Sequence, residues 1–260
     1  MCWSGIRIPS IIVMIFLGLG LSSCEGPEGP QGPQGPSALM TGVYGEVAWG
    51  WWSATINAEF EVFESPSIPT VQINGIPCQR QFTMYGDGFK FYGTDLPLAL
   101  GDSVHIIVNY LKPDGDPEVI QSDIILPGPF AFTAPDTSDD VVISVGDSLM
   151  VSWTESSGAD VYSVDFSFRY NYFDTLGGYQ VYTFELDTLI TETAITFGSE
   201  LLFPNPALID SIVSYGGNGW FNVWAKHGPW REGDPTNVYG DGIGTFYGRT
   251  FGGHLTLFAE

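Results

Sequence analysis

Basic side chains are scarce in this chain: 8 Lys and Arg stand against 30 Asp and Glu among 260 residues, for a formal net charge of −22. Proteins bind nucleic acid through clustered Lys and Arg, so this composition argues against a nucleic-acid partner. An anionic membrane surface or an acidic polysaccharide would also repel the chain unless cations bridged the two. The composition therefore predicts an acidic surface protein that does not bind polyanions.

Cysteine is nearly absent. The chain has Cys2, Cys24 and Cys78, of which the first two lie at or before the end of an N-terminal targeting segment. Cys78 would then be alone, so we expect no intramolecular disulfide in the mature chain. A catalytic thiol needs a lowered pKa, usually beside a histidine. Cys78 follows the turn residues Asn74 and Gly75 in an expected strand, and we predict that it is a small buried hydrophobe.

Recognisable catalytic motifs are also missing. The histidines, His105, His227 and His254, form no His-x-x-x-His pair, and the sequence has neither Gly-x-Ser-x-Gly nor a phosphate-binding loop. Thirty acidic residues could always supply a carboxylate pair for glycoside hydrolysis, but no pair stands out among so many. We therefore expect no enzyme, and a secreted hydrolase is the weakest of the alternatives.

What is present begins with an apolar run over Ile11–Leu21 that follows Arg7, the first basic residue. The run is too short to span a bilayer comfortably, and it leads into the small residues Ser22 and Ser23 and then Cys24. Residues 1–23 resemble a bacterial lipoprotein signal peptide, with Leu21 to Cys24 as the lipobox. The resemblance implies cleavage before Cys24, acylation (palmitate) of its thiol and new amino group, and a lipid anchor in the cell envelope, at the outer membrane or cell surface. An ordinary secretory signal with an unrelated cysteine is the alternative.

Four Gly-Pro-x triplets follow over residues 26–37. Glycine at every third position with proline after it is the collagen pattern, and residues 24–37 resemble a short collagen-like spacer. Three such chains could wind into a trimer. The alternative is a single polyproline II segment, about 37 Å long at ~3.1 Å per residue. Either form would hold the following domains away from a membrane.

From residue 38 onward the patterns predict strands. Residues 54–62 alternate between apolar and polar side chains, with Glu59 and Glu61 on the polar side, as a half-buried strand requires. Residues 71–73 lead into the turn Asn74-Gly75, and Pro77 predicts that the next strand either lies at a sheet edge or begins beyond the proline. Residues 38–128 are predicted to form one antiparallel immunoglobulin-like β-sandwich, ending at the Pro127-Gly128-Pro129 segment.

Residues 129–260 repeat the theme. The segments Leu149–Trp153, Gly158–Val164 and Trp220–Ala225 resemble the strands of a fibronectin type III-like domain, in which an early tryptophan packs in the core. The pattern departs from that family through an insert at residues 171–215 and a glycine-rich tail. The resemblance implies a second antiparallel β-sandwich, hence an all-β chain of two tandem domains, and a family that is mostly adhesive or architectural.

Two local predictions concern the second half. Asn205 and Pro206, followed by apolar residues up to Val213, favour a short helix that ends at Gly216. Trp220 and Trp224 share one face of an expected strand, and we predict that this face lies in the core.

Calcium is the metal that the composition favours, because hard cations bind several carboxylate and carbonyl oxygens. The best candidate is the junction cluster of Asp136, Asp139 and Asp140, where a cation would stiffen the connection between domains. The alternative is that these residues simply form turns. Two further groups have the same character, namely Asp114, Asp116 and Glu118, and Asp234, Asn237 and Asp241.

Aromatic side chains suggest a ligand. Trp49, Trp51 and Trp52 cluster near the start, and Trp230 lies in an expected loop, where it is the best candidate for an exposed ring. Exposed Trp and Tyr stack on apolar faces of ligands such as sugars. We take Trp51, Trp52 and Trp230 as candidate ligand-binding residues; core packing is the alternative.

Together these patterns predict a lipid-anchored, extracytoplasmic protein that acts as a non-enzymatic interaction or structural module. Its partner would be a protein or a polysaccharide, and carbohydrate binding through exposed aromatics is the leading alternative to a purely adhesive role.

Overall fold

The computed structural model describes residues 40–50, 55–81, 88–136, 140–213, 219–230 and 234–260. Cys24 and its lipobox, the Gly-Pro-x segment, Trp51, Trp52 and Asp139 lie outside these ranges. Leu39–Glu260 form one compact unit. Within the described ranges, none of the helices has both the length and the apolar character that crossing a bilayer demands.

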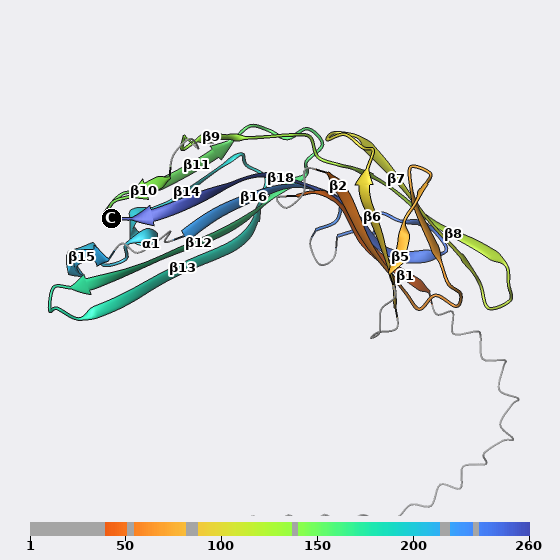
Figure 1. The fold of residues 1–260 in the computed structure, drawn as a ribbon, viewed down its shortest axis with the longest axis horizontal. Helices are drawn as coiled ribbons and strands as arrows, with labels where there is room; N and C mark the ends of the chain where they lie inside the picture. The colour runs from red at the N-terminus through yellow and green to blue at the C-terminus, as the bar shows by residue number, and fades with distance from the viewer. Residues whose placement is uncertain (1–39, 51–54, 82–87, 137–139, 214–218, 231–233) are drawn as a thin grey trace, which may run out of the picture. The chain divides into compact units, whose positions relative to one another are not determined.

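The largest sheet has ten strands and contains residues from both halves of the sequence (Figure 1). Its main path runs β13-β12-β16-β18-β1-β2-β6-β5, with β15 beside β12 and β10 beside β18. The strands are β1 (Thr41–Trp49), β2 (Ile56–Phe63), β5 (Gln79–Gln81), β6 (Gly88–Leu96), β10 (Val141–Ile143), β12 (Val161–Asp174), β13 (Tyr179–Ile190), β15 (Ile209–Val213), β16 (Gly219–His227) and β18 (Gly242–Ala259).

Two smaller sheets provide the second layer of each half. The five-stranded sheet runs β17-β8-β7-β3-β4, and the three-stranded sheet runs β14-β11-β9. Their strands are β3 (Thr70–Ile73), β4 (Ile76–Pro77), β7 (Ser103–Leu111), β8 (Pro117–Ile125), β9 (Phe132–Ala134), β11 (Leu149–Trp153), β14 (Ala194–Phe197) and β17 (Tyr239–Gly240). The fold is therefore all-β and two-layered, as the sequence predicts.

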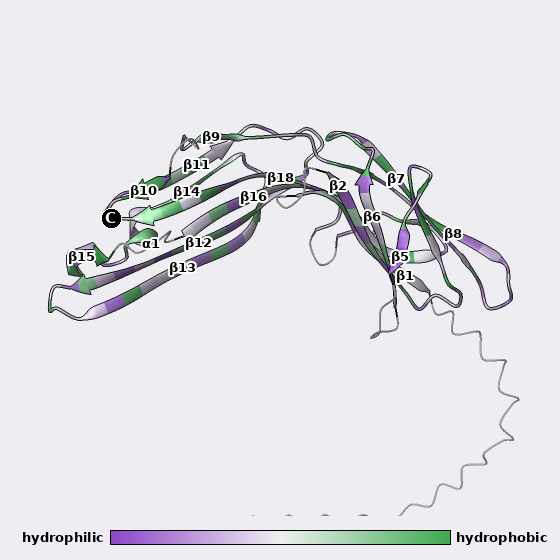
Figure 2. Ribbon diagram, viewed as in Figure 1, coloured by the Kyte–Doolittle hydropathy of each residue, from purple (hydrophilic) through white to green (hydrophobic). Residues whose placement is uncertain are grey.

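Two hydrophobic cores lie between these layers. The first contains residues of the segment 43–126 together with Phe246, and the second contains residues of 130–259, with Trp153 and Phe166 among its large side chains. Colouring by hydropathy shows the alternation along single strands that such one-sided burial requires (Figure 2). In β2 the buried residues are Ile56, Ala58, Phe60 and Val62. The alternating pattern predicted for this strand is confirmed.

The last strand, β18, belongs to both halves. It runs parallel to β1 from Gly242 to Thr250, antiparallel to β16, and parallel to β10 at its end. Phe246 packs in the first core, whereas Leu255 and Leu257 pack in the second. Among the strands of the described residues, two pairings are thus parallel and the others are antiparallel, and the glycine-rich tail forms a central strand.

Close backbone approach explains two of the glycines in β18. A Cβ at Gly248 would lie 2.2 Å from the carbonyl oxygen of Ile125, and one at Gly252 would lie 2.0 Å from the Phe130 ring. Only glycine lets the shared strand pass this near the segment that joins the two halves. That segment is itself hydrogen-bonded, since Thr250 Oγ1 donates to the Pro127 carbonyl at 2.6 Å and Ser156 Oγ to that of Gly128 at 2.7 Å.

The hairpin predicted at Asn74-Gly75 is confirmed. Both residues have positive φ, 47° and 80°, and Ile73 pairs with Ile76 across the turn. Pro77 lies in β4, at the end of the five-stranded sheet, where its missing N–H costs no ladder bond.

The helix predicted after Asn205 is wrong. Pro206–Leu208 form one 3-10 turn, and Ile209–Val213 form strand β15; the short helix α1 lies earlier, at Ser199–Leu202. Asn205 makes no side-chain capping bond. β15 pairs with the end of β12, and this ladder together with the packing of Ile209 and Ile212 on the second core overrides the local helical pattern.

The predicted facing of β16 is also wrong. Its buried side is Phe221, Val223 and Ala225, whereas Trp220 and Trp224 lie on the other side of the sheet, with Trp220 exposed. Alternation with a period of two shows which residues share a face of a strand, but it does not show which of the two faces packs on the core. Here both faces carry bulky apolar residues, so sequence alternation could not choose between them.

Candidate functional site

An open patch lies on the outward face of the ten-stranded sheet where β1, β2 and β18 run side by side. Val43 and Val47 of β1 point into the first core, so Tyr44 and Glu46 between them point outward. The parallel pairing with β18 places Tyr247 opposite Glu46. The alternation of the strand and the register of β18 thus bring these three side chains together.

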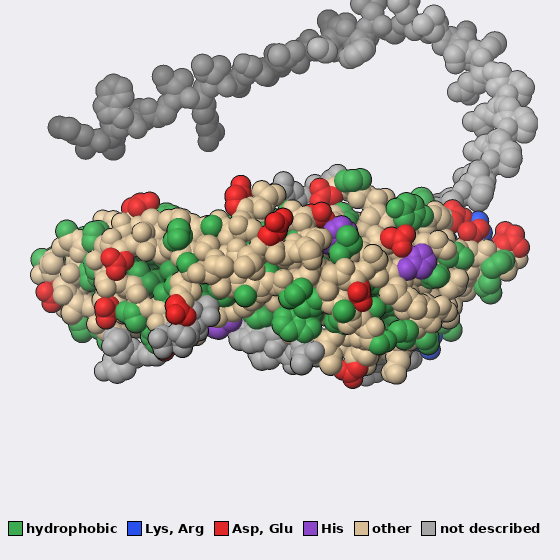
Figure 3. All heavy atoms as spheres, turned by 90° about the horizontal axis from the view of Figure 1, so that it is seen from above, with side chains coloured by type: hydrophobic (Ala, Val, Ile, Leu, Met, Phe, Trp, Pro, Cys, Tyr) green, Lys and Arg blue, Asp and Glu red, His purple; other side chains and the backbone are tan. Residues whose placement is uncertain are grey.

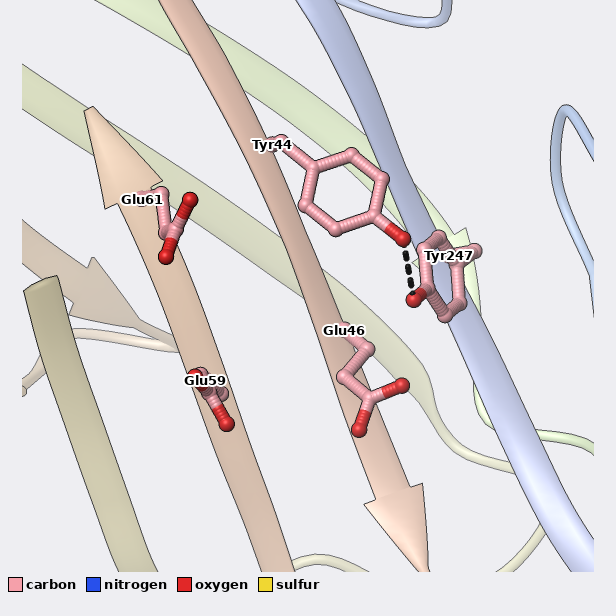
Figure 4. A pocket seen from close by; sticks show the side chains of 5 residues that line it. All are labelled: Tyr44, Glu46, Glu59, Glu61 and Tyr247. Atoms are coloured by element: carbon pink, nitrogen blue, oxygen red, sulfur yellow. Dashed lines mark hydrogen bonds between the residues drawn. The ribbon is translucent and has the colours of Figure 1, made fainter. Parts of the chain in front are cut away.

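Strand β2 completes the patch. Glu61 lies opposite Tyr44, and Glu59 lies opposite Glu46. Tyr44, Glu46, Glu59, Glu61 and Tyr247 line a pocket of about 290 Å³, and all five side chains are drawn in Figure 4. We call these five residues the tyrosine–glutamate patch.

The two tyrosines are joined by their hydroxyls, whose oxygens are 2.6 Å apart, and their rings meet edge to face at 5.5 Å. Tyr44 is 46% exposed and Tyr247 only 8%. Burial raises the pKa of Tyr247, as do the Tyr44 hydroxyl and the nearby charge of Glu46. Tyr247 is therefore a neutral phenol at neutral pH, held beneath an exposed ring.

The carboxylates of the patch are mostly paired with cations. Arg249 Nη2 lies 2.9 Å from Glu46, and Lys90 contacts Glu61 and lies 3.8 Å from Glu59. The hydrogen bond and charge of Glu61 raise the pKa of Lys90, which is half-buried. Three glutamates beside two cations leave a local charge near −1 in a chain whose formal charge is −22.

Aromatic and cationic side chains extend the patch toward β16. Trp230 packs on Tyr247 at 4.0 Å between ring centroids, with Lys226 Nζ 4.0 Å from the indole centroid. Arg249 lies over Trp224 at 4.5 Å. Burial lowers the pKa of Lys226, as does the nearby charge of Arg249. Each of these cations lies over the face of an indole ring, where the ring quadrupole attracts it.

Trp230, a predicted ligand-binding residue, is therefore half-buried. Its backbone N–H donates to Asp234 Oδ2 at 2.8 Å, and its side chain lines a separate groove of about 540 Å³ beside Asp160 and His227. His227 Nδ1 lies 3.0 Å from Asp160 Oδ2. Trp230 contacts the tyrosine–glutamate patch at Tyr247. The other two predicted residues, Trp51 and Trp52, lie outside the described residues.

The predicted calcium clusters are engaged in other contacts where the structure describes them. Lys112 Nζ lies 2.5 Å from Glu118 and 2.6 Å from Asp241, and the amide of Asn237 bonds both backbone polar groups of Phe246. Within the described ranges, no group of three or more His, Cys, Asp or Glu side chains is arranged for a metal. The junction cluster includes Asp139, which lies outside those ranges, so the structure does not describe it together with Asp136 and Asp140.

Cys78 is half-buried against the first core, and burial raises the pKa of its thiol to about 11. It is thus protonated at neutral pH, which suits the predicted packing role better than a nucleophilic one.

Sequence reasoning found only part of the tyrosine–glutamate patch. The alternation of residues 54–62 already turned Glu59 and Glu61 outward, but nothing in the sequence linked them to Tyr247, which is 186 positions further along than Glu61. The link is the parallel pairing of β1 with β18. A parallel pair has no turn to mark it in sequence.

These features define an all-β, two-core protein with an open, aromatic and carboxylate-lined patch. No protein-family profile matches the chain, and no curated protein matches it in sequence. Among solved structures, the chain is similar to the crystal structure of DIP-gamma IG1+IG2. The match covers 84% of this chain and 95% of that chain, with 8% sequence identity and a TM-score of 0.23.

Proposed function

We propose that this chain is a non-enzymatic binding module that recognises a carbohydrate at the tyrosine–glutamate patch. The observation that carries the proposal is the exposed Tyr44 ring, fixed by Tyr247 and surrounded by Glu46, Glu59 and Glu61. An exposed ring held in place can stack on the apolar C–H face of a sugar with little loss of side-chain entropy. The glutamates can accept hydrogen bonds from sugar hydroxyls.

The local charge favours a neutral, polyhydroxylated ligand over a strongly basic one. Arg249 and Lys90 already neutralise most of the carboxylate charge, so a cationic ligand would have to displace them. The N–H groups of Arg249 and Lys90 are hydrogen-bond donors that lie beside the carboxylate acceptors. A sugar hydroxyl can both donate and accept, so it can bond to groups of either kind. A partly open pocket of about 290 Å³ suits one or two sugar rings of a longer chain.

We further propose that the module is displayed from the cell envelope. Cys24 in its lipobox would carry the lipid, and the Gly-Pro-x segment would lift the module away from the membrane. In this arrangement the acidic surface keeps the module off anionic lipid. Figure 3 shows acidic side chains spread over one face of the molecule.

The experiment is retention of residues 39–260 on a panel of neutral polysaccharides, with Tyr44→Ala as the test variant. We expect saturable binding that weakens about tenfold, ~1.4 kcal/mol, when the ring is removed. Tyr239→Ala is the matched control, because Tyr239 is also exposed but lies in the five-stranded sheet, at the groove beside Trp230.

Loss of binding in Tyr239→Ala but not in Tyr44→Ala would move the site to the groove. Retention on no glycan would contradict the carbohydrate proposal and favour a protein partner. Release of sugar fragments from any polysaccharide would contradict the claim that the module is non-enzymatic.

A further inference from the structure

Strand β13 ends the ten-stranded sheet and has a free side. Twelve residue pairs join it to β12 without a register shift, from Tyr162↔Ile190 to Phe173↔Tyr179. No strand of the described ranges pairs with its other side. An end strand of this kind presents a row of unsatisfied backbone N–H and C=O groups, which can pair with another strand.

Several of the usual protections of an edge strand are missing from β13. The 12 residues of β13 include no Pro, Gly, Lys or Arg, and its ladder has no bulge. Tyr179 and Val181 are 56% and 50% exposed. The charged residues are Glu185 and Asp187. Proteins that keep an edge monomeric commonly place lysine, proline or a bulge along it, so this edge fits a partner strand.

We propose that the partner is β13 of a second copy of this chain, paired antiparallel with Phe184 at the centre of symmetry. Residues that lie directly opposite each other in an antiparallel pair point to the same face of the sheet. Because faces alternate along a strand, opposed residues of two identical strands must differ by an even number of positions. The two-fold axis therefore passes through a residue and not between two residues. Centres at Glu185, Leu186 or Asp187 would oppose like charges, which is destabilising. The two carboxylates therefore restrict the register toward the N-terminal half of β13.

The Phe184 register matches side chains on both faces of the strand. On the inward face, Phe184 would meet its own copy, and Tyr182 would meet Leu186; all three are now half-buried. On the outward face, Thr183 would meet Glu185. The pairing would thus finish the burial of apolar groups at the sheet edge without placing one carboxylate against another.

Arg169 distinguishes this register from its neighbours. It is exposed on β12 directly opposite Thr183, and it forms no ion pair within the described ranges. In the Phe184 register, Thr183 lies beside Glu185 of the second copy. Arg169 and that Glu185 would then be two strands apart, about 10 Å between Cα atoms, which two long side chains can span. The two-fold symmetry of the dimer would give two such contacts, one from the Arg169 of each copy.

A centre at Thr183 instead aligns Arg169 with its own copy and leaves it without a carboxylate. The Phe184 register therefore gives two Arg–Glu pairs that counter the general repulsion between two acidic chains. The association does not depend on what the tyrosine–glutamate patch binds.

Sedimentation of residues 39–260 tests the association. This segment holds both cores and lacks the Gly-Pro-x triplets, which could themselves bring chains together. We expect a dimer at micromolar concentration in about 0.15 M salt. Arg169→Glu should raise the dimer dissociation constant at least tenfold, and Arg169→Glu with Glu185→Arg should restore it. Arg80→Glu, the same charge change at the opposite end of the sheet, should leave the constant unchanged.

Disulfide trapping tests the register, in a Cys78→Ala background. Val181→Cys with Asp187→Cys should form a covalent dimer on mild oxidation, because residue 181 faces residue 187 of the other copy in the Phe184 register and Glu185 is retained. Thr183→Cys alone should not. A dimer trapped by Thr183→Cys alone would overturn the Phe184 register, and a monomer at every concentration would overturn the association.

Discussion

At the scale of single residues, the stability of the fold depends on a few positions where the presence or absence of one atom matters. Tyr247 and Gly248 are neighbours in β18, and they show two such cases. Tyr247 offers a hydroxyl to Tyr44 on the outward face, and Gly248 offers no side chain at all where the strand crosses the Ile125 carbonyl.

Tyr247→Phe should lower the free energy of unfolding by about 1 kcal/mol, because it removes the bond to the Tyr44 hydroxyl. Urea unfolding measures this. The pKa of Tyr247 is raised in the folded state, so its protonated form contributes stability below pH ~10 that is lost as pH rises above the ordinary tyrosine value. The variant should therefore lose less stability than the parent above pH 10. An equal loss in both proteins would contradict the assigned cause.

Gly248→Ala should destabilise the fold by more than ~2 kcal/mol, because the new Cβ would lie 2.2 Å from a backbone oxygen that cannot turn aside. Gly50→Ala is the control, since its nearest neighbour would be 3.7 Å away. Thermal unfolding of the two variants should separate them clearly; similar melting temperatures would show that β18 shifts freely.

At the scale of elements, local pattern and tertiary contact contribute unequally. The β3–β4 hairpin follows its sequence, because Asn74 and Gly75 supply the positive φ that a two-residue turn needs. Residues 205–213 do not adopt the helix that their local pattern favours, because the helix propensity of so short a segment stabilises less than backbone pairing with β12 does. Strand β16 shows a third case, in which the period is correct but the buried face is not.

Gly75→Ala tests the hairpin. A Cβ at Gly75 meets nothing within 4 Å, so the whole cost is the strain of alanine at φ 80°, about 1 kcal/mol. Gly75→Asn should cost less, because asparagine tolerates this conformation. Urea midpoints give both values, and equal costs for Ala and Asn would contradict the backbone explanation.

At the scale of the whole molecule, β18 couples the two cores. One strand places Phe246 in the first and Leu257 in the second, and the connecting segment at Pro127 and Gly128 is bonded to residues of the second half. The two halves therefore share backbone ladders and are not joined by a free linker. A destabilising substitution in β18 should therefore weaken both hydrophobic cores.

Phe246→Ala should cost about 3–5 kcal/mol, as expected for a fully buried ring. Hydrogen exchange should then show weaker amide protection in β1 and β2 and also in β16, because β18 lies between them. Ile124→Ala, in the five-stranded sheet, should weaken mainly the first core. Loss of protection confined to the first half in both variants would contradict the coupling.

The period and approximate extent of most strands, the hairpin at Asn74 and the outward direction of Glu59 and Glu61 can all be predicted from the sequence, because alternation and turn chemistry are local. The buried face of β16, the close contacts that require glycine in the tail and the contact between Tyr247 and Tyr44 are visible only in the folded chain. Those depend on the pairing of β1 with β18, which joins residues about 200 positions apart. A parallel pairing over such a separation leaves no local pattern in the chain.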